Sequence, residues 1–244
     1  STITDDYETL NMYKWGLDSS YGLTGMAEGE FAVQDLTWEI VNKMNLGVEL
    51  GFLNGMIDLQ LDYFDERRKD IFMPRESVPM TAGFMKQPWK NFGKVTNQGV
   101  EVSLNVNKQF GKDLFVNLRG TFTYDHNEIT EKDEPSAVVG TNRAETGHPV
   151  GQLTGYIAEG LFTADDFEDV STGKLKEGIP TQSFVGKLRP GDIRYRDVNG
   201  DGKVDVFDKS PIGGTKDPEI VYGFGLNMKY KNLDFGALFQ GIGR

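Results

Sequence analysis

A run of acidic and amide side chains between residues 197 and 208 has the spacing of a calcium-binding loop. Oxygen-bearing side chains recur at loop positions 1, 3, 5, 9 and 12, and Gly202 stands at position 6, where such loops turn sharply. Lys203, at position 7, could contribute its backbone carbonyl oxygen. The candidate calcium ligands are therefore Asp197, Asn199, Asp201, Lys203, Asp205 and Asp208.

The last position of this loop departs from the usual pattern. An EF-hand loop ends in Glu, which binds calcium through both carboxylate oxygens, whereas the last residue here is the shorter Asp208. Four carboxylates in one short loop would repel each other without a cation, which favours a structural calcium ion. The alternative is an ordinary surface turn, in which Asn-Gly and Asp-Gly pairs punctuate the chain and the acids are solvated.

Other residue types that carry catalytic chemistry are sparse. The only histidines are His126 and His148, and the chain has no cysteine. No Ser-His-Asp or nucleophile-elbow pattern stands out. Acid pairs such as Asp165-Asp166 are more simply explained as solvated loop residues than as the carboxylates of a glycosidase. We therefore expect no enzymatic activity.

Composition and charge exclude two further classes of function. The net charge is -11, and phosphate groups would repel such a chain, so we expect no nucleic-acid partner. No run of about 18 apolar residues occurs, which excludes a transmembrane helix. The mean hydropathy of -0.44 is compatible with a membrane barrel, because barrel strands are apolar on one face only.

Long amphipathic strands would position the acidic loop. From Leu46 to Phe52, apolar residues alternate with glycine and glutamate, which indicates a strand with one apolar face. Asn54-Gly55 follows, a pair that favours a tight type I′ turn, and the alternation then resumes from Ile57 to Tyr63. The sequence predicts six strands, at about 45-53, 56-66, 99-107, 114-126, 219-230 and 233-240.

Strand length and loop length both favour a membrane-spanning barrel. The predicted strands run for about 9 to 12 residues, the length that a tilted strand needs to cross hydrocarbon. Short turns follow every other strand, whereas long connections run from Arg67 to Gln98 and from Asn127 to Glu219. Outer-membrane barrels alternate short periplasmic turns and long extracellular loops in this way. The predicted fold class is all-β, an antiparallel transmembrane β-barrel segment with long extracellular loops.

Two other folds would also explain the alternation. A soluble β-sandwich or β-solenoid would make the chain a calcium-stabilised secreted β-domain for adhesion or carbohydrate binding, although shorter and more regularly spaced strands are typical of those folds. A complete small barrel of about eight to ten strands fits the chain length. It requires strands within residues 1-44 and pairing between the two ends of the sheet.

Several segments resemble the SusC/RagA family of TonB-linked outer-membrane transporters. They follow the order and spacing of the last third of such transporters, and the resemblance covers residues 36-244. The segments are Leu36-Glu39 with Asn45-Phe52, Leu61-Phe64, Asn91-Glu101, Pro190-Asp205, Pro211-Gly213, Tyr222-Phe224 and Phe239-Gly241.

The resemblance implies that the chain is part of a barrel of about 22 strands, with a plug domain inside it and energy supplied by the TonB complex. It also implies a SusD-like surface lipoprotein over the extracellular mouth and the import of large nutrients, such as glycans or peptides, across the outer membrane of Bacteroidetes. Outer-membrane lipid would surround the strands. The plug, the TonB box and the lid-binding region are not recognisable in residues 1-244, so we expect the chain to be incomplete at both ends.

Overall fold

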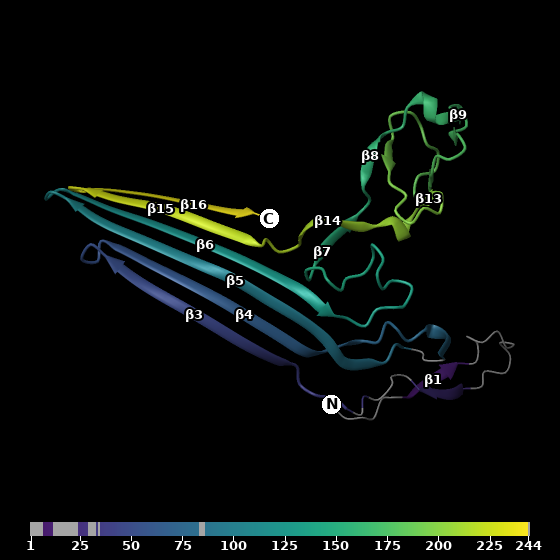
Figure 1. The fold of residues 1–244 in the computed structure, drawn as a ribbon, viewed down its shortest axis with the longest axis horizontal. Helices are drawn as coiled ribbons and strands as arrows, with labels where there is room; N and C mark the ends of the chain where they lie inside the picture. The colour runs from purple at the N-terminus through teal and green to yellow at the C-terminus, as the bar shows by residue number, and fades with distance from the viewer. Residues whose placement is uncertain (1–6, 12–23, 29–32, 34, 83–85, 244) are drawn as a thin grey trace.

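The fold is known from a computed structural model that describes residues 7-11, 24-28, 33, 35-82 and 86-243. Its main element is an antiparallel sheet of six long strands in the order β16-β15-β6-β5-β4-β3 (Figure 1). The predicted antiparallel all-β fold is thus confirmed. The strands are β3 (Ile40-Phe52), β4 (Ile57-Pro74), β5 (Trp89-Phe110), β6 (Leu114-Glu131), β15 (Ile220-Tyr230) and β16 (Leu233-Gly243).

The sheet has one apolar and one polar face. Residues paired across antiparallel strands point to the same side, so the register aligns side chains in rows across all six strands. One row is apolar apart from its last member, a glycine: Val48, Leu61, Val102, Phe122, Tyr222 and Gly241. The next row lies on the opposite face and is polar apart from a glycine: Glu49, Gln60, Ser103, Thr121, Gly223 and Gln240.

The apolar face is not covered by other parts of the described chain. Leu61 is 39% exposed, Phe122 39% and Phe224 54%. A contiguous apolar surface of this extent marks a contact with lipid or with another protein. The sheet therefore has no core of its own on either side.

The only sizeable group of buried hydrophobic side chains in the described residues lies at one end of the sheet, in the segment 156-209, which we call the loop lobe. Phe162, Phe167 and Leu188 are buried there against Leu175, Ile179 and Val185. Three short strand pairs build the lobe: β8 (Ala158-Leu161) with β12 (Ile193-Tyr195), β9 (Phe167-Asp169) with β10 (Lys174-Leu175), and β11 (Thr181-Gln182) with β13 (Lys203-Val204).

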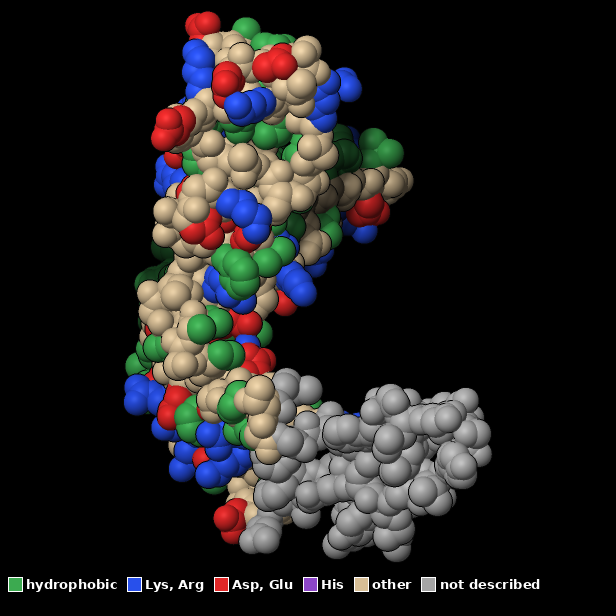
Figure 2. Space-filling model, turned by 90° about the vertical axis from the view of Figure 1, so that its right-hand side faces the viewer, with side chains coloured by type: hydrophobic (Ala, Val, Ile, Leu, Met, Phe, Trp, Pro, Cys, Tyr) green, Lys and Arg blue, Asp and Glu red, His purple; other side chains and the backbone are tan. Residues whose placement is uncertain are grey.

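A fourth strand pair, β7 (Gln152-Gly155) with β14 (Ser210-Thr215), connects the lobe to the sheet (Figure 1). The remaining short elements are the 3-10 turns η3 (Met80-Ala82), η4 (Ala164-Asp166) and η5 (Val206-Asp208). Charged side chains of both signs are spread over this end of the molecule (Figure 2). Among the described residues, no helix is long and apolar enough to cross a membrane.

The sheet is open. β3 and β16 form its two edges and do not pair with each other in the described part of the chain. Before β3, the described residues contain two strands, β1 (Tyr7-Asn11) and β2 (Thr24-Glu28), but these pair only with each other. A small barrel closed between the ends of this chain is therefore contradicted.

The six strands occur at the predicted places, but four of them extend by several residues beyond the predicted ends. β4 continues to Pro74 rather than 66, β5 begins at Trp89 rather than 99, and β6 continues to Glu131 rather than 126. Register shifts fall in these extensions, between Arg68 and Ile71 and next to Lys94. A bulge interrupts the period of two on which the prediction rests, so the alternation hid the outer parts of the strands. β3, which begins at Ile40 rather than 45, has no such interruption.

The shorter of the two long connections, residues 75-88, is tied to the end of β6 by one carboxylate. Asp133 is buried, and it accepts hydrogen bonds from the backbone N-H of Ser77 at 3.0 Å and from its hydroxyl at 2.8 Å. The Nε of Arg75 lies 3.0 Å from the same carboxylate. Burial alone would raise the pKa of Asp133, but these donors outweigh it, so the pKa lies below its ordinary value of 3.8.

The depressed pKa makes this tie dependent on pH. A carboxylate with a lowered pKa in the folded state contributes stability that is complete above the ordinary pKa and is lost as the pH falls through the folded pKa. We expect protection of the Ser77 amide from hydrogen exchange, corrected for intrinsic rates, to fall below about pH 4. Asp133→Asn should lower that protection at neutral pH and remove its pH dependence. An unchanged Ser77 amide in this variant, relative to the exposed control Asp165→Asn, would contradict the assignment.

Candidate functional site

The predicted calcium loop, residues 197-208, lies at the base of the loop lobe and is held at both ends. It starts two residues after β12, which pairs with β8, and it ends two residues before β14, which pairs with β7. Within the loop, β13 pairs in parallel with β11. These three pairings bring the six predicted ligands into one compact turn.

The carboxylate of Asp208 is the centre of this turn. The side chain is fully buried, and its Oδ1 accepts hydrogen bonds from the backbone N-H groups of Val198 at 2.8 Å and Asn199 at 3.3 Å. Its Oδ2 accepts one from the N-H of Asp205 at 2.7 Å. A buried carboxylate is costly unless it is well bonded, and here the loop backbone supplies the bonds. Asp208 thus closes the loop from its last position to its second and third.

Asp197, at the first position, holds the opposite side of the turn. Its two oxygens accept hydrogen bonds from the N-H groups of Gly200 and Gly202, each at 2.7 Å. Both glycines have positive φ, +75° and +84°, which other residues adopt only at a cost. The structure therefore places a left-handed turn at Gly202, the position where the spacing requires one.

The remaining predicted ligands bond to each other and to nearby amides. Asp201 accepts from the N-H of Lys203 at 2.9 Å and from the side-chain amide of Asn199 at 3.2 Å. The Nζ of Lys203 lies 2.7 Å from the carboxylate of Asp205. The hydrogen bond from Lys203 is the main cause that lowers the pKa of Asp205, and the same bond raises the pKa of Lys203.

The six predicted ligands, in the conformation of the structure, do not converge on one point where a cation could bind. The described residues contain no group of three or more His, Asp or Glu side chains placed to hold one metal ion. Both oxygens of Asp208 face backbone amides, and the ammonium of Lys203 already neutralises Asp205. Binding of calcium would have to release Lys203 and turn the carboxylates inward. Calcium at this loop therefore stays a prediction from the spacing, and the structure offers hydrogen bonding as a second explanation of the same residues.

A chelator distinguishes these two explanations. If calcium holds the loop, EGTA should lower the thermal transition of the loop lobe by several degrees, and Asp201→Asn should lose this response. This variant suits the test because Asp201 is exposed and makes only local hydrogen bonds, whereas Asp208→Asn would disturb the loop under either explanation. The measurement is differential scanning calorimetry of the purified membrane protein, and a transition indifferent to EGTA would contradict calcium.

Comparison with known proteins identifies the sheet. A family model described as "TonB dependent receptor-like, beta-barrel" matches residues 7-231. The chain belongs to this family. It is a barrel part of an outer-membrane receptor, which confirms the predicted resemblance and the predicted location.

Individual relatives agree with this assignment. The chain is 24% identical to TonB-dependent receptor P3 of Formosa agariphila over 96% of its own length, and 29% identical to TonB-dependent receptor SusC of Bacteroides thetaiotaomicron over 83%. It spans 23% and 19% of the length of these two proteins.

Solved structures show the same fold. The match to the RagAB peptide importer in its open-open state covers 97% of this chain and 23% of the importer chain, with a TM-score of 0.64 and 22% identity. The match to the closed-closed state covers 97% of this chain and 24% of the importer chain, with a TM-score of 0.62 and 21% identity.

Some residues that shape this end of the molecule escaped the sequence analysis. Asp133 and Ser77 are 56 positions apart, and no local pattern pairs them. Asn142 donates to the carbonyl oxygens of Phe207 at 3.0 Å and Lys209 at 2.7 Å, so it joins the start of the long connection to the end of the acidic loop. Only the fold brings such distant residues together.

Proposed function

We propose that the chain is part of the barrel wall of an importer of large nutrients, either glycans or peptides, which works with a SusD-like surface lipoprotein and draws energy from the TonB complex. The observation that carries the proposal is the two-faced sheet: its apolar face suits lipid, and its polar face suits a water-filled lumen. The relatives support it, since one is the receptor SusC and another is the RagAB peptide importer.

The polar face has the character of a lumen wall. Asn117 donates to Asn105 at 2.7 Å and to Asn107 at 2.9 Å, and it accepts from Asn227 at 3.1 Å. Amide groups at this density would be poorly satisfied against hydrocarbon. They are well suited to bind water or a polar solute passing along the wall.

The alternative, a calcium-stabilised secreted β-domain, accounts less well for the apolar face. A sandwich would cover that face with a second sheet, and no second sheet packs on it among the described residues. The strands are also much longer than the usual five or six residues, with β5 spanning 22. The family is one of receptors and transporters rather than enzymes, which agrees with the absence of catalytic patterns in the sequence.

A charge placed on the apolar face tests which side meets lipid. Leu61→Arg should destabilise the membrane-embedded protein by about 2-4 kcal/mol, the cost of an arginine on the lipid face near the bilayer centre. Gln60→Arg, one residue earlier on the polar face, should change the stability by less than about 1 kcal/mol. The measurement is urea unfolding in lipid vesicles. Equal effects of the two substitutions would oppose the assigned faces.

Import itself is tested in cells. Deletion of the gene should abolish TonB-dependent accumulation of a labelled oligosaccharide or a labelled peptide, and the affinity-tagged protein should co-purify with a surface lipoprotein encoded in the same strain. Panels of labelled glycans and peptides are compared between the deletion strain and the complemented strain. Uptake of both panels at the parental rate in the deletion strain would refute the proposed function.

A further inference from the structure

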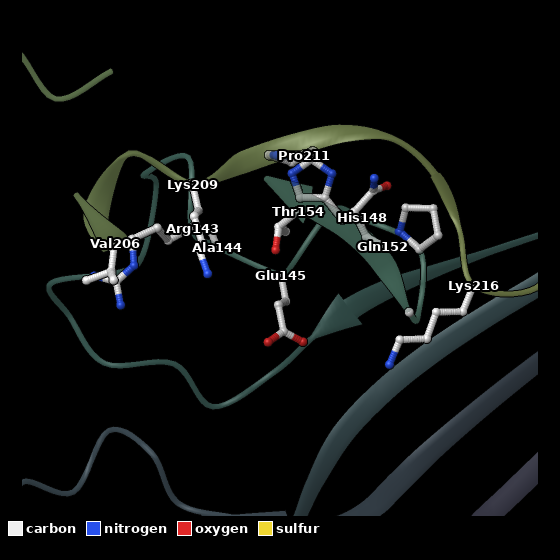
Figure 3. A pocket seen from close by; sticks show the side chains of 12 residues that line it. Arg143, Ala144, Glu145, His148, Gln152, Thr154, Val206, Lys209, Pro211 and Lys216 are labelled. Atoms are coloured by element: carbon white, nitrogen blue, oxygen red, sulfur yellow. The ribbon is translucent and has the colours of Figure 1, made fainter. Parts of the chain in front are cut away.

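A cavity of about 390 Å³ lies beside the β7-β14 pair, where the loop lobe joins the sheet, and we call it the basic pocket (Figure 3). Its size falls in the range of sites for small molecules, about 300-1,000 Å³. The pocket is lined by two stretches of chain that are far apart in the sequence, within 143-154 and 206-216: Arg143, Ala144, Glu145, His148, Pro149, Gly151, Gln152, Thr154, Val206, Lys209, Pro211 and Lys216.

The walls of the pocket are fixed by hydrogen bonds. β7 and β14 form one side, and Gln152 reinforces this pair by donating to the carbonyl oxygen of Gly214 at 3.0 Å. Asn142 holds the opposite side through its bonds to Phe207 and Lys209. The N-H of Lys216 donates to the carbonyl oxygen of Gly151 at 3.1 Å. A ligand would therefore meet a site that is already formed, which reduces the entropy lost on binding.

The charge of the lining is opposite to that of the chain. Arg143, Lys209 and Lys216 are cationic, and Glu145 is the single acid, so the lining carries a net charge of 3 - 1 = +2, in a chain of net charge -11. None of the three cations forms an ion pair with a described residue, whereas the carboxylate of Glu145 is paired with Lys132 at 2.8 Å. The pocket thus keeps an unneutralised positive charge.

Aromatic rings hold two of the cations in place. The guanidinium of Arg143 lies 4.8 Å from the ring centre of Phe207, and the ammonium of Lys209 lies 5.8 Å from that of Tyr156. Such contacts orient the cation and leave its N-H donors available. The carboxylate of Asp205 is bonded to Lys203, which is the main cause that lowers the pKa of Asp205, and the charge of Arg143 is the last of the causes that lower it. In Figure 3, Arg143 and Lys209 approach from one side and Lys216 from the other.

The neutral and acidic groups define the rest of the ligand. The carboxylate of Glu145 and the hydroxyl of Thr154 lie between the cations (Figure 3) and accept hydrogen bonds from hydroxyl groups. The rings of Pro149 and Pro211 add apolar surface. A carboxylate of a peptide side chain has no hydroxyl groups beside it, whereas a sugar ring carries both hydroxyl groups and an apolar C-H face. The combination fits an acidic sugar better than an acidic peptide.

We propose that the basic pocket binds an acidic saccharide unit, with Arg143, Lys209 and Lys216 around its oxyanion and Glu145 and Thr154 at its hydroxyl groups. The oxyanion is a uronic acid carboxylate or a sulfate ester. This inference rests on the proposed function only for the arrival of saccharides at the outer face. Binding itself depends on the pocket alone.

Calorimetric titration of the detergent-purified membrane protein tests the proposal. The probes are digalacturonate, a disaccharide carrying one sulfate ester, a neutral disaccharide of the same size, and triglutamate. We expect one of the two acidic disaccharides to bind at least tenfold more tightly than the neutral one, with an affinity that falls as salt is added. Lys209→Gln and Arg143→Gln should each weaken this binding about tenfold or more. Lys174→Gln removes the same charge from the lobe outside the pocket and should leave binding unchanged.

Each contrary outcome is decisive. Equal binding of neutral and acidic disaccharides, equal effects of Lys209→Gln and Lys174→Gln in variants with unaltered thermal transitions, or tight binding of triglutamate alone would overturn the proposal. The titration needs neither TonB nor the lipoprotein. A protein that binds acidic saccharides without importing any nutrient would refute the proposed function and leave the pocket assignment standing. A protein that imports nutrients but does not bind acidic saccharides would refute the pocket assignment and leave the proposed function standing.

Discussion

The backbone of a membrane strand has no water to bond to, and the arrangement of this chain follows from that constraint. Each unpaired N-H or C=O group costs several kcal/mol in hydrocarbon, so β4, β5, β6 and β15 each have a partner on both sides. The same constraint applies to β3 and β16, whose outer edges require neighbouring strands when the sheet lies in a bilayer. Once the hydrogen bonds between the strands fix the register, every second side chain faces lipid. The row from Val48 to Tyr222 is apolar for that reason.

Beyond the sheet, the loop lobe has too little apolar material for a large core, and acidic side chains supply much of its order. Asp208 accepts three backbone N-H bonds and Asp197 accepts two. Asp166 accepts from the N-H of Thr163, and Asp192 accepts from that of Arg189. Hydrogen bonds from amides to carboxylates are stronger than those between neutral groups. The acidic composition of the chain therefore reflects, in part, the need to fix long connections without burying hydrophobic residues.

The sequence alone was sufficient for features that depend on local periodicity. The alternation from Leu46 to Tyr63 predicted the first hairpin, because each side chain reports which face it lies on. It was insufficient where bulges broke the period, as between Arg68 and Ile71. The spacing from Asp197 to Asp208 identified a turn built on carboxylates, but spacing does not determine whether a cation or the backbone amides bind those carboxylates. The basic pocket had no local signal at all, because Arg143 and Lys209 meet only through the fold.

The basic pocket lies where the hydrogen-bonded sheet meets the loop lobe, so its shape depends on both. One of its walls is β14, which pairs with β7 and leads into β15 after four residues, so the geometry of the pocket depends on the register of the sheet. The opposite wall includes Val206 and Lys209, and Val206 belongs to the turn that the carboxylate of Asp208 closes. A ligand at this site would contact both the β7-β14 pair, which leads into the sheet, and residues of the loop lobe. It would thereby stabilise their relative position, since any molecule that binds only one arrangement of two elements favours that arrangement.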